Sequence, residues 1–453
     1  MAKYKSYPEY NDSEIEWLGK IPSGWLLKKA KYIFQRVQRP LRNIDGVVTA
    51  FRDGQVTLRT NRRTDGFTNS VKEIGYQGVR RNDLVIHAMD GFAGAIGVSD
   101  SDGKCSPVCS VCIPWENQSV NIHFYGYLVR QLAVTDFIFS LAKGIRERST
   151  EFRFSEFSGL MLPIPPIYEQ NQITTFLDYE TAKIDNLIEK QQQLIELLKE
   201  KRQAEISHAV TKGLNPDVPM KDSGVDWLGE VPAHWELIPL KYLCNFSGGG
   251  TPTKDNLSYW KGGTVPWVSP KDMKSFWISE TQDYVTPKAV SESSTNYVEE
   301  SSLLMVVRSG ILQRNIPVAI NIIKVTMNQD MKALKFNERM KVHYAAYFIN
   351  GNVNSLLLEW TKEGATVESI EHEYLANSLI PVPPIEEQYS IIKSISQQMK
   401  RFESLEEKAI IGIRLLQERR TALISAAVTG KIDVRDWVAP ETQKAGKPEE
   451  TAV

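Results

Sequence analysis

The sequence predicts an α+β protein: two β-rich α+β domains in a pseudo-two-fold arrangement, separated by a pair of long antiparallel helices of the coiled-coil type. A tryptophan motif occurs twice, a proline motif occurs twice, and a long helical pattern follows each proline motif. A repeat period above 200 residues indicates a duplicated domain rather than a solenoid. The expected segments are a first β-rich domain, a helix region, a second β-rich domain, a second helix region and a disordered tail, at 1–165, 166–215, 216–383, 384–435 and 436–453.

The two repeated motifs define a constant frame. W-L-G-x-x-P-x-x-W occurs at 17–25 and again, 210 residues later, at 227–235, and these motifs hold four of the ten tryptophans. P-x-P-P-x-x-E-Q occurs at 163–170 and again, 218 residues later, at 381–388. The segments between the motifs share no pattern that can be aligned, so the frame repeats while its contents differ.

A helical apolar pattern follows each proline motif. Positions from Ile173 to Leu198 keep the i, i+3, i+4, i+7 spacing, which predicts a helix from about Glu169 to Lys212 with Gly213 as its left-handed cap. About 40 residues of helix reach roughly 60 Å. The second helix is expected to begin near Glu386, with Gly430 as its cap. Such a stripe also suits a core helix in one globule, but two matched helices favour antiparallel pairing as a spacer.

The segments before each helix carry strand patterns. Short apolar runs such as 83–87 and 302–307 are broken by Gly, Pro, Asn and Asp. Runs of this length between turn residues predict β-rich α+β domains.

Composition limits the partners and the compartment. The net charge is −1, but residues 1–165 carry five more basic than acidic side chains and residues 166–229 carry four more acidic ones. A protein that gripped DNA alone is usually more basic, so either nucleic acid is not the ligand or a partner supplies charge. The N-terminus has no apolar signal region, and no run of about 18 apolar residues occurs, which predicts a cytoplasmic protein without membrane contact.

Motifs for catalysis or metal binding are missing. The sequence has no G-x-x-x-x-G-K-[ST] loop, the run Gly248–Gly250 is interpreted as a turn, and no methyltransferase tetrapeptide or H-E-x-x-H occurs. Cys105, Cys109 and Cys112 could begin a zinc site, but a fourth ligand is hard to assign and the segment also suits a buried strand. We therefore expect no metal and no catalytic residue.

Basic residues in the first half suggest a nucleic-acid surface. Arginine forks match guanine or phosphate, and Asn matches adenine, although a solvated charged face is the alternative interpretation. The candidates are Arg52, Arg59, Asn61, Arg62, Arg63, Arg80 and Arg81, with a second basic loop of Lys143, Arg146 and Arg148.

Both motifs, with a long helix ending in Ala-Val-Thr after each second motif, resemble the specificity subunit (HsdS) of type I restriction-modification enzymes. In the second half, Gly249–Pro252, Tyr259-Trp260 and Asn328–Asp330 look like a common version of the family's target recognition domain. In the first half, Asn82–Asp90 and Gly94–Gly97 look like a different version. The likeness covers nearly the whole chain.

The resemblance implies a non-catalytic subunit that reads a bipartite, asymmetric target in double-stranded DNA. Two HsdM-type methyltransferase subunits would bring S-adenosylmethionine and methylate adenine, and HsdR-type subunits would use ATP and Mg²⁺ for translocation and cleavage. Candidate DNA-binding residues in the second domain are Thr251, Trp267, Ser269, Lys271, Arg308, Asn328, Gln329 and Lys362, of which Trp267 also suits the core. The alternatives are a scaffold with two peptide-binding domains on a coiled coil, and a nuclease with scattered carboxylates.

Overall fold

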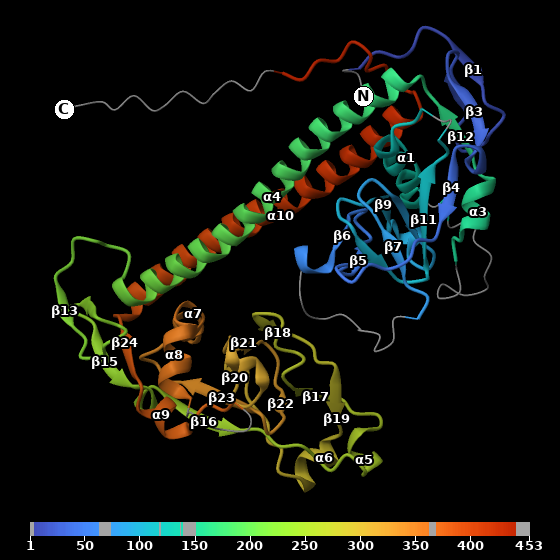
Figure 1. Ribbon diagram of the computed structural model, residues 1–453. Coiled ribbons are helices and arrows are strands. Elements are labelled where there is room, and N and C mark those ends of the chain that lie inside the picture. Colours follow the sequence, from blue (N-terminus) through green and yellow to red (C-terminus); the bar gives the residue numbers. More distant parts are fainter. Residues whose placement is uncertain are drawn as a thin grey trace, which may run out of the picture. The chain divides into compact units, whose positions relative to one another are not determined.

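The computed structural model describes residues 4–62, 74–116, 119–135, 137–138, 151–361 and 368–440 (Figure 1). The chain divides into two compact units. Unit 1 comprises residues 1–191 and 411–453, and unit 2 comprises residues 192–410. Each unit therefore combines one β-rich region with part of both long helices.

In unit 1, two short antiparallel strand pairs carry the repeated motifs. Strand β1 (Tyr10–Asp12) pairs with β2 (Lys20–Pro22), and β3 (Leu26–Lys29) pairs with β12 (Met161–Ile164). The second pair joins the segment after the tryptophan motif to the proline motif. Two motifs that are far apart in the sequence thus become neighbours.

The main sheet of unit 1 has four antiparallel strands in the order β4-β11-β8-β9. Its central strand β8 has Leu84, Val85 and Ile86 fully buried, as expected for an apolar run covered on both faces. Helix α1 packs against β9, and Figure 1 shows α1 beside this sheet. The bounds are β4 (Phe34–Val37), β5 (Val48–Ala50), β6 (Val56–Leu58), β7 (Gln77–Val79), β8 (Leu84–His87), β9 (Ile96–Val98), β10 (Gly103–Cys105), β11 (Cys109–Pro114), α1 (Ile122–Val134) and α3 (Phe154–Gly159).

Unit 2 begins with the same two strand pairs, β13-β14 and β15-β24. Its main sheet has the order β16-β23-β20-β21-β18, and a smaller sheet has the order β19-β17-β22. The bounds are β13 (Met220–Asp222), β14 (Glu230–Pro232), β15 (Glu236–Pro239), β16 (Cys244–Gly248), α5 (Leu257–Trp260), β17 (Val265–Val268), β18 (Trp277–Ile278), β19 (Asp283–Val285), α6 (Pro287–Glu292), β20 (Leu303–Val306), β21 (Val318–Asn321), β22 (Thr326–Met327), β23 (Met331–Phe336), α7 (Val342–Gly351), α8 (Val353–Trp360), α9 (His372–Asn377) and β24 (Leu379–Val382).

The two main sheets share a strand order that the sequence does not reveal. In chain order, β4, β8, β9 and β11 of unit 1 correspond to β16, β20, β21 and β23 of unit 2, and each set is arranged as first, fourth, second, third. The halves therefore repeat the sheet as well as the frame. What differs is the additional structure: the strand pairs β5-β6 and β7-β10 in unit 1, and in unit 2 the smaller sheet and the extra edge strand β18 of the main sheet.

The predicted helices are confirmed. Helix α4 (Ile167–Lys212) has 46 residues and α10 (Ile385–Val428) has 44 residues. Gly213 and Gly430 have φ values of 78° and 71°, the left-handed conformation expected of a residue that ends a helix.

Antiparallel pairing of the helices is visible inside each unit. In unit 1 the beginning of α4 shares a core with the end of α10, represented by Phe176 and Leu423. In unit 2 the end of α4 shares a core with the beginning of α10, represented by Val210 and Ile391. Several apolar residues nearer the middle of the helices remain exposed, so pairing buries only part of the stripe: Leu187, Ile411 and Leu415 in unit 1, and Leu194, Leu197, Leu405 and Ile410 in unit 2.

Candidate nucleic-acid interface

The repeated motifs meet in a buried polar contact at the base of unit 1. Trp25 Nε1 donates to Glu169 Oε2 at 2.8 Å, and Tyr7 Oη donates to the same oxygen at 2.9 Å. Burial and the Glu169 carboxylate raise the pKa of Tyr7. In unit 1 the last tryptophan of one motif thus holds the glutamate of the other.

The glutamine of the proline motif is fully buried in both units and makes matching contacts. Gln170 accepts from the backbone N–H of Asn121 at 2.8 Å and donates to the carbonyl of Pro165 at 2.8 Å. Gln388 accepts from the backbone N–H of Lys341 at 2.8 Å and donates to a proline carbonyl at 2.9 Å. Asn121 and Lys341 precede α1 and α7, so each glutamine positions the helix that packs on its sheet.

The second copy changes the tryptophan contact. Trp235 is fully buried, but its Nε1 has no hydrogen-bond partner among the described residues. Glu387 is contacted instead by His234 Nε2 at 2.8 Å. The frame therefore keeps its shape while one buried donor has no acceptor.

The predicted arginines of unit 1 lie on the loops around β5, β6 and β8, and most of their forks are occupied. Arg52 pairs with Asp90 at 2.8 Å, and Arg62 pairs with Asp53 at 2.6 Å. The Arg62 guanidinium also lies over the Phe51 ring at 4.3 Å. These pairs are partly exposed, and such pairs contribute only about 0–1 kcal/mol, so an incoming phosphate could replace the carboxylates.

Arg59 and Asn61 contact neighbouring threonines. Arg59 Nε donates to Thr49 Oγ1 at 2.9 Å, and Asn61 Nδ2 donates to Thr57 Oγ1 at 2.8 Å. Arg59 is half-buried and Asn61 is exposed, so both side chains reach the surface of unit 1.

Arg80 and Arg81 belong to a network of carboxylates that the sequence did not reveal. Arg80 Nη1 donates to the Val79 carbonyl at 2.7 Å and lies 3.4 Å from Asp45. Burial raises the pKa of Asp45, but hydrogen bonds from Arg42 and the charge of Arg80 outweigh it and lower that pKa overall. The Arg81 backbone N–H donates to Asp102 at 2.9 Å while its side chain is exposed. Arg81 is thus the more available of the two.

Several candidates lie outside the described residues. These are Arg63, Lys143, Arg146, Arg148 and Lys362.

In unit 2 the structure brings four of the predicted residues together at one cavity of about 520 Å³, called here the Trp267 cavity. Trp267, Ser269, Lys271 and Asn328 all line it. The prediction did not include the four other lining residues: Lys254, Trp260, Pro270 and Asp283. The adjacent aromatic pair at 259–260 was the available signal for Trp260, whereas Lys254 and Asp283 reach the cavity only through the fold.

Two of the residues that line the Trp267 cavity, Trp267 and Ser269, are held by contacts within the protein. Trp267 is 6% exposed, donates from Nε1 to the Gly250 carbonyl at 3.1 Å, and meets the Trp260 ring edge-on at 5.1 Å. The Ser269 hydroxyl is bonded to Asp272 at 3.0 Å within its own turn. Lys271 is exposed and its side chain makes no hydrogen bond or ion pair with the described residues. Lys254, which is also exposed, likewise makes no side-chain hydrogen bond or ion pair with the described residues.

Asn328 is held by a close approach of the chain. Its Oδ1 accepts from the Asp330 backbone N–H at 3.1 Å, and its Nδ2 lies 3.3 Å from the Asp330 carboxylate. A Cβ at Gly249 would lie 1.8 Å from the Asn328 carbonyl oxygen, so only glycine fits there. The glycine run predicted as a turn thus packs its backbone against the predicted adenine-matching residue.

The remaining predicted residues of unit 2 lie nearby on its loops. Thr251 donates to Gln329 Oε1, and the exposed Arg308 forms a backbone bridge with Ser369. Among the described residues, the Arg308 side chain has no hydrogen-bond or ion-pair partner. Arg308 therefore presents a free fork, unlike Arg52 and Arg62 of unit 1.

The cysteines lie in the core rather than at a surface site. Cys105, Cys109, Cys112 and Cys244 are buried free thiols. Burial raises the pKa of Cys112 well above its ordinary value. Within the described ranges, no group of three or more His, Cys, Asp or Glu residues could hold a metal ion. In the same ranges, no helix has the length and apolar character needed to cross a membrane.

Comparisons with known proteins find similarity to specificity subunits of type I restriction-modification systems. A family profile described as the type I restriction modification DNA specificity domain matches residues 232–414. The chain is 35% identical over 179 residues to the EcoR124I/EcoR124II specificity subunit of Escherichia coli, covering 39% of this chain and 41% of that relative. It is 22% identical over 451 residues to the putative MjaX specificity subunit of Methanocaldococcus jannaschii, covering 95% of this chain and 98% of that relative.

The fold has solved counterparts. The crystal structure of the HsdS subunit from Thermoanaerobacter tengcongensis superposes with a TM-score of 0.53 at 15% identity, covering 91% of this chain and 98% of that chain. Two β-rich regions built on one frame, with paired long helices, define a duplicated architecture that matches the fold of this solved subunit. Residues 232–414 match the DNA specificity domain of type I restriction-modification systems, and nearly the whole chain is similar to specificity subunits (HsdS) of those systems.

Proposed function

We propose that this subunit reads a bipartite, asymmetric target in double-stranded DNA, one half with each β-rich region. The main support is that both units keep one strand order and one frame, while the side chains on their loops differ in type and pairing. A common scaffold with different exposed groups is suited to reading two different short sequences. Each good bidentate pair to a base edge discriminates by about 1–3 kcal/mol, so two half-sites multiply their selectivity.

The chain supplies recognition, and partner subunits supply the chemistry. We propose that two HsdM-type subunits bring S-adenosylmethionine and methylate an adenine in each half-site, and that HsdR-type subunits use ATP and Mg²⁺ to translocate and cut unmodified DNA. The exposed apolar residues of the long helices support docking of such partners, because each unit leaves several large side chains uncovered, including Leu194 and Leu415. The paired helices would set the gap between the half-sites, and the complex would act in the cytoplasm.

The methylated-adenine motif of a host genome tests this proposal. The host would carry the chain together with its methyltransferase subunit, and a matched strain would lack only the chain. We expect a two-part motif with a fixed gap in the first strain and its loss in the second. A motif that survives deletion of the chain, or one continuous motif, would contradict the proposal. A strain lacking only the methyltransferase subunit controls for methylation by other enzymes.

A further inference from the structure

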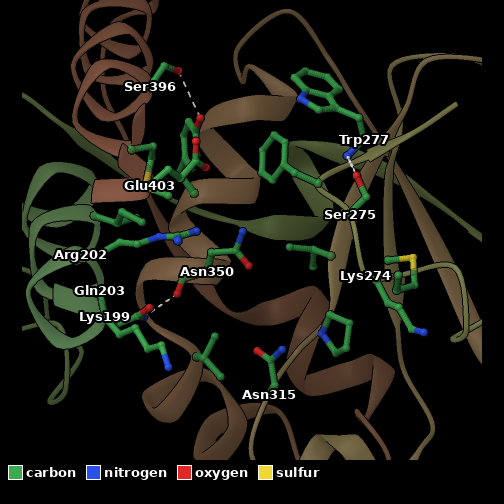
Figure 2. Close-up of a pocket in the computed structure, with 18 of the residues that line it drawn as sticks. Lys199, Arg202, Gln203, Lys274, Ser275, Trp277, Asn315, Asn350, Ser396 and Glu403 are labelled. Carbon is green, nitrogen blue, oxygen red and sulfur yellow. Dashed lines mark hydrogen bonds between the residues drawn. The ribbon is translucent and has the colours of Figure 1, made fainter. Parts of the chain in front are cut away.

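A second cavity in unit 2 lies where the paired helices meet the β-rich region. It has a volume of about 830 Å³ and is called here the junction cavity. Its walls come from α4, α7, α10 and the loop that leads to β18, all within residues 192–410. Figure 2 shows Arg202 extending from its helix toward Asn350.

The charged side chains of the junction cavity are mostly basic. Lys199, Arg202, Lys274 and Lys400 line it with a single carboxylate, Glu403. Lys199 is partly neutralised by Glu196, 2.8 Å away on the same helix. Within the described part of the chain, the side chains of Arg202, Lys274 and Lys400 have no hydrogen-bond or ion-pair partner. The cavity therefore offers three cations without an ion-pair partner among the described residues, beside one carboxylate.

The corresponding helix positions in unit 1 show that basic side chains without an ion-pair partner are not a general feature of the two helices. The 218-residue shift relates Arg202 to Arg420 and Glu403 to Asp185. In unit 1, Arg420 and Asp185 form a two-pronged ion pair at 2.8 and 3.2 Å, and the cavity that Arg420 lines has a volume of only about 280 Å³. In unit 2 the related arginine and carboxylate form no ion pair among the described residues. The same two positions are paired in one unit and open in the other.

One loop lines both the junction cavity and the Trp267 cavity. Residues Ser269, Pro270 and Lys271 line the Trp267 cavity, and the next residues, from Met273 to Trp277, line the junction cavity. Lys271 and Lys274 thus place a cation in the wall of each cavity, three positions apart. A ligand that carries negative charge at regular intervals could contact both.

Duplex DNA is such a ligand, because it carries one phosphate charge for about every 1.7 Å of helix axis. Resting on the proposed function, we infer that the junction cavity binds the phosphate backbone of the target just outside the half-site read by the Trp267 cavity. Arg202 and Lys400 supply the principal contacts, and Asn350 and Ser396 border them with polar groups. These contacts hold the duplex in register and carry no sequence information.

The test measures binding of the complete complex with its methyltransferase subunits to duplexes bearing the methylated motif or a scrambled one. The double variant Arg202→Gln with Lys400→Gln is compared with Lys201→Gln with Lys408→Gln, which removes two exposed charges of the same helices outside the cavity. Fluorescence anisotropy over a range of salt concentrations gives the affinity and its salt slope.

The cavity variant is expected to bind both duplexes more weakly, by roughly threefold to tenfold for each cation removed, with the preference for the motif unchanged. The slope of log K against log salt is negative, and its magnitude should decrease by about 0.9 for each phosphate that is no longer neutralised. The variant Arg202→Lys keeps the charge and should retain most of the affinity that Arg202 contributes. Binding equal to the Lys201/Lys408 variant would overturn the inference, and so would a weakening confined to the motif duplex. If the wild-type complex showed no preference for the motif, the proposed function itself would fail.

Discussion

Unit 1 and unit 2 are built on one frame but differ in how their charges are compensated. In unit 1, Arg52, Arg62 and Arg80 face aspartates, as in the Arg62–Asp53 pair at 2.6 Å. In unit 2, Lys271 and Arg308 have no such partner among the described residues. Counting basic residues in the sequence favours the first half, but of its described candidate arginines only Arg81 has an exposed side chain with no partner among the described residues. Whether a basic side chain is available to bind DNA therefore depends on whether the fold places a carboxylate beside it.

The largest expected effect tests the part of the frame that both units share. Gln170→Leu leaves a part-buried backbone N–H and a buried carbonyl without their partner. Gln388→Leu leaves a part-buried backbone N–H and two carbonyls without theirs. Each substitution should lower the free energy of unfolding by about 2–4 kcal/mol. Urea unfolding followed by circular dichroism measures the decrease, and the exposed Gln397→Leu is the control. A much smaller cost in one unit would show that the two frames are not equivalent.

The next effect tests where the frames differ. Trp25→Phe removes the donor that holds Glu169, whereas Trp235→Phe removes a donor that has no acceptor among the described residues. Hydrogen bonds to charged groups contribute about 1.5–3 kcal/mol. Trp25→Phe should therefore cost about 1–2 kcal/mol more than Trp235→Phe in the same unfolding measurement. Equal costs would mean that the Glu169 contact adds no net stability.

A smaller effect compares free and paired arginines in DNA binding. Arg308→Ala should weaken binding of the complete complex by roughly threefold to tenfold, because it removes a free cation. Arg62→Ala should weaken binding through the first half-site by less, about twofold to threefold, because DNA must first displace Asp53. Anisotropy on duplexes with one half-site mutated measures both. Unchanged affinity for Arg62→Ala would remove Arg62 from the recognition surface.

Much of the frame could be predicted from the sequence because its signals are local or repeated. The helix caps at Gly213 and Gly430 and the pairing of α4 with α10 follow from glycine and apolar spacing. The shared strand order could not be predicted, because the short strands of the two halves share no alignable pattern. The ion pairs could not be predicted either, because a carboxylate such as Asp90 lies 38 positions from Arg52 in the sequence and reaches it only once the chain has folded.

The smallest effect concerns pH and two half-buried histidines. Burial lowers the pKa of His343 below 6.5, and it also lowers that of His87, although the nearby Asp90 carboxylate acts in the opposite direction. A base with a lowered pKa in the folded state binds fewer protons than in the unfolded state, so stability is lost as the pH falls below about 6.5. Asp45 and Asp102, whose pKa values are lowered from 3.8, remain charged in this range and do not contribute.

The melting temperature of the wild-type chain should therefore fall between about pH 7.5 and about pH 5.5. His343→Gln should reduce that fall more than His87→Gln, because His343 lies against the Trp277 ring at 5.1 Å and no charged group shifts its pKa, whereas Asp90 offsets the burial of His87. The exposed His208→Gln provides the control. A larger change for His87→Gln would show that the carboxylate beside it does not compensate burial, and the contrast in charge compensation between the two units would then not extend to their histidines.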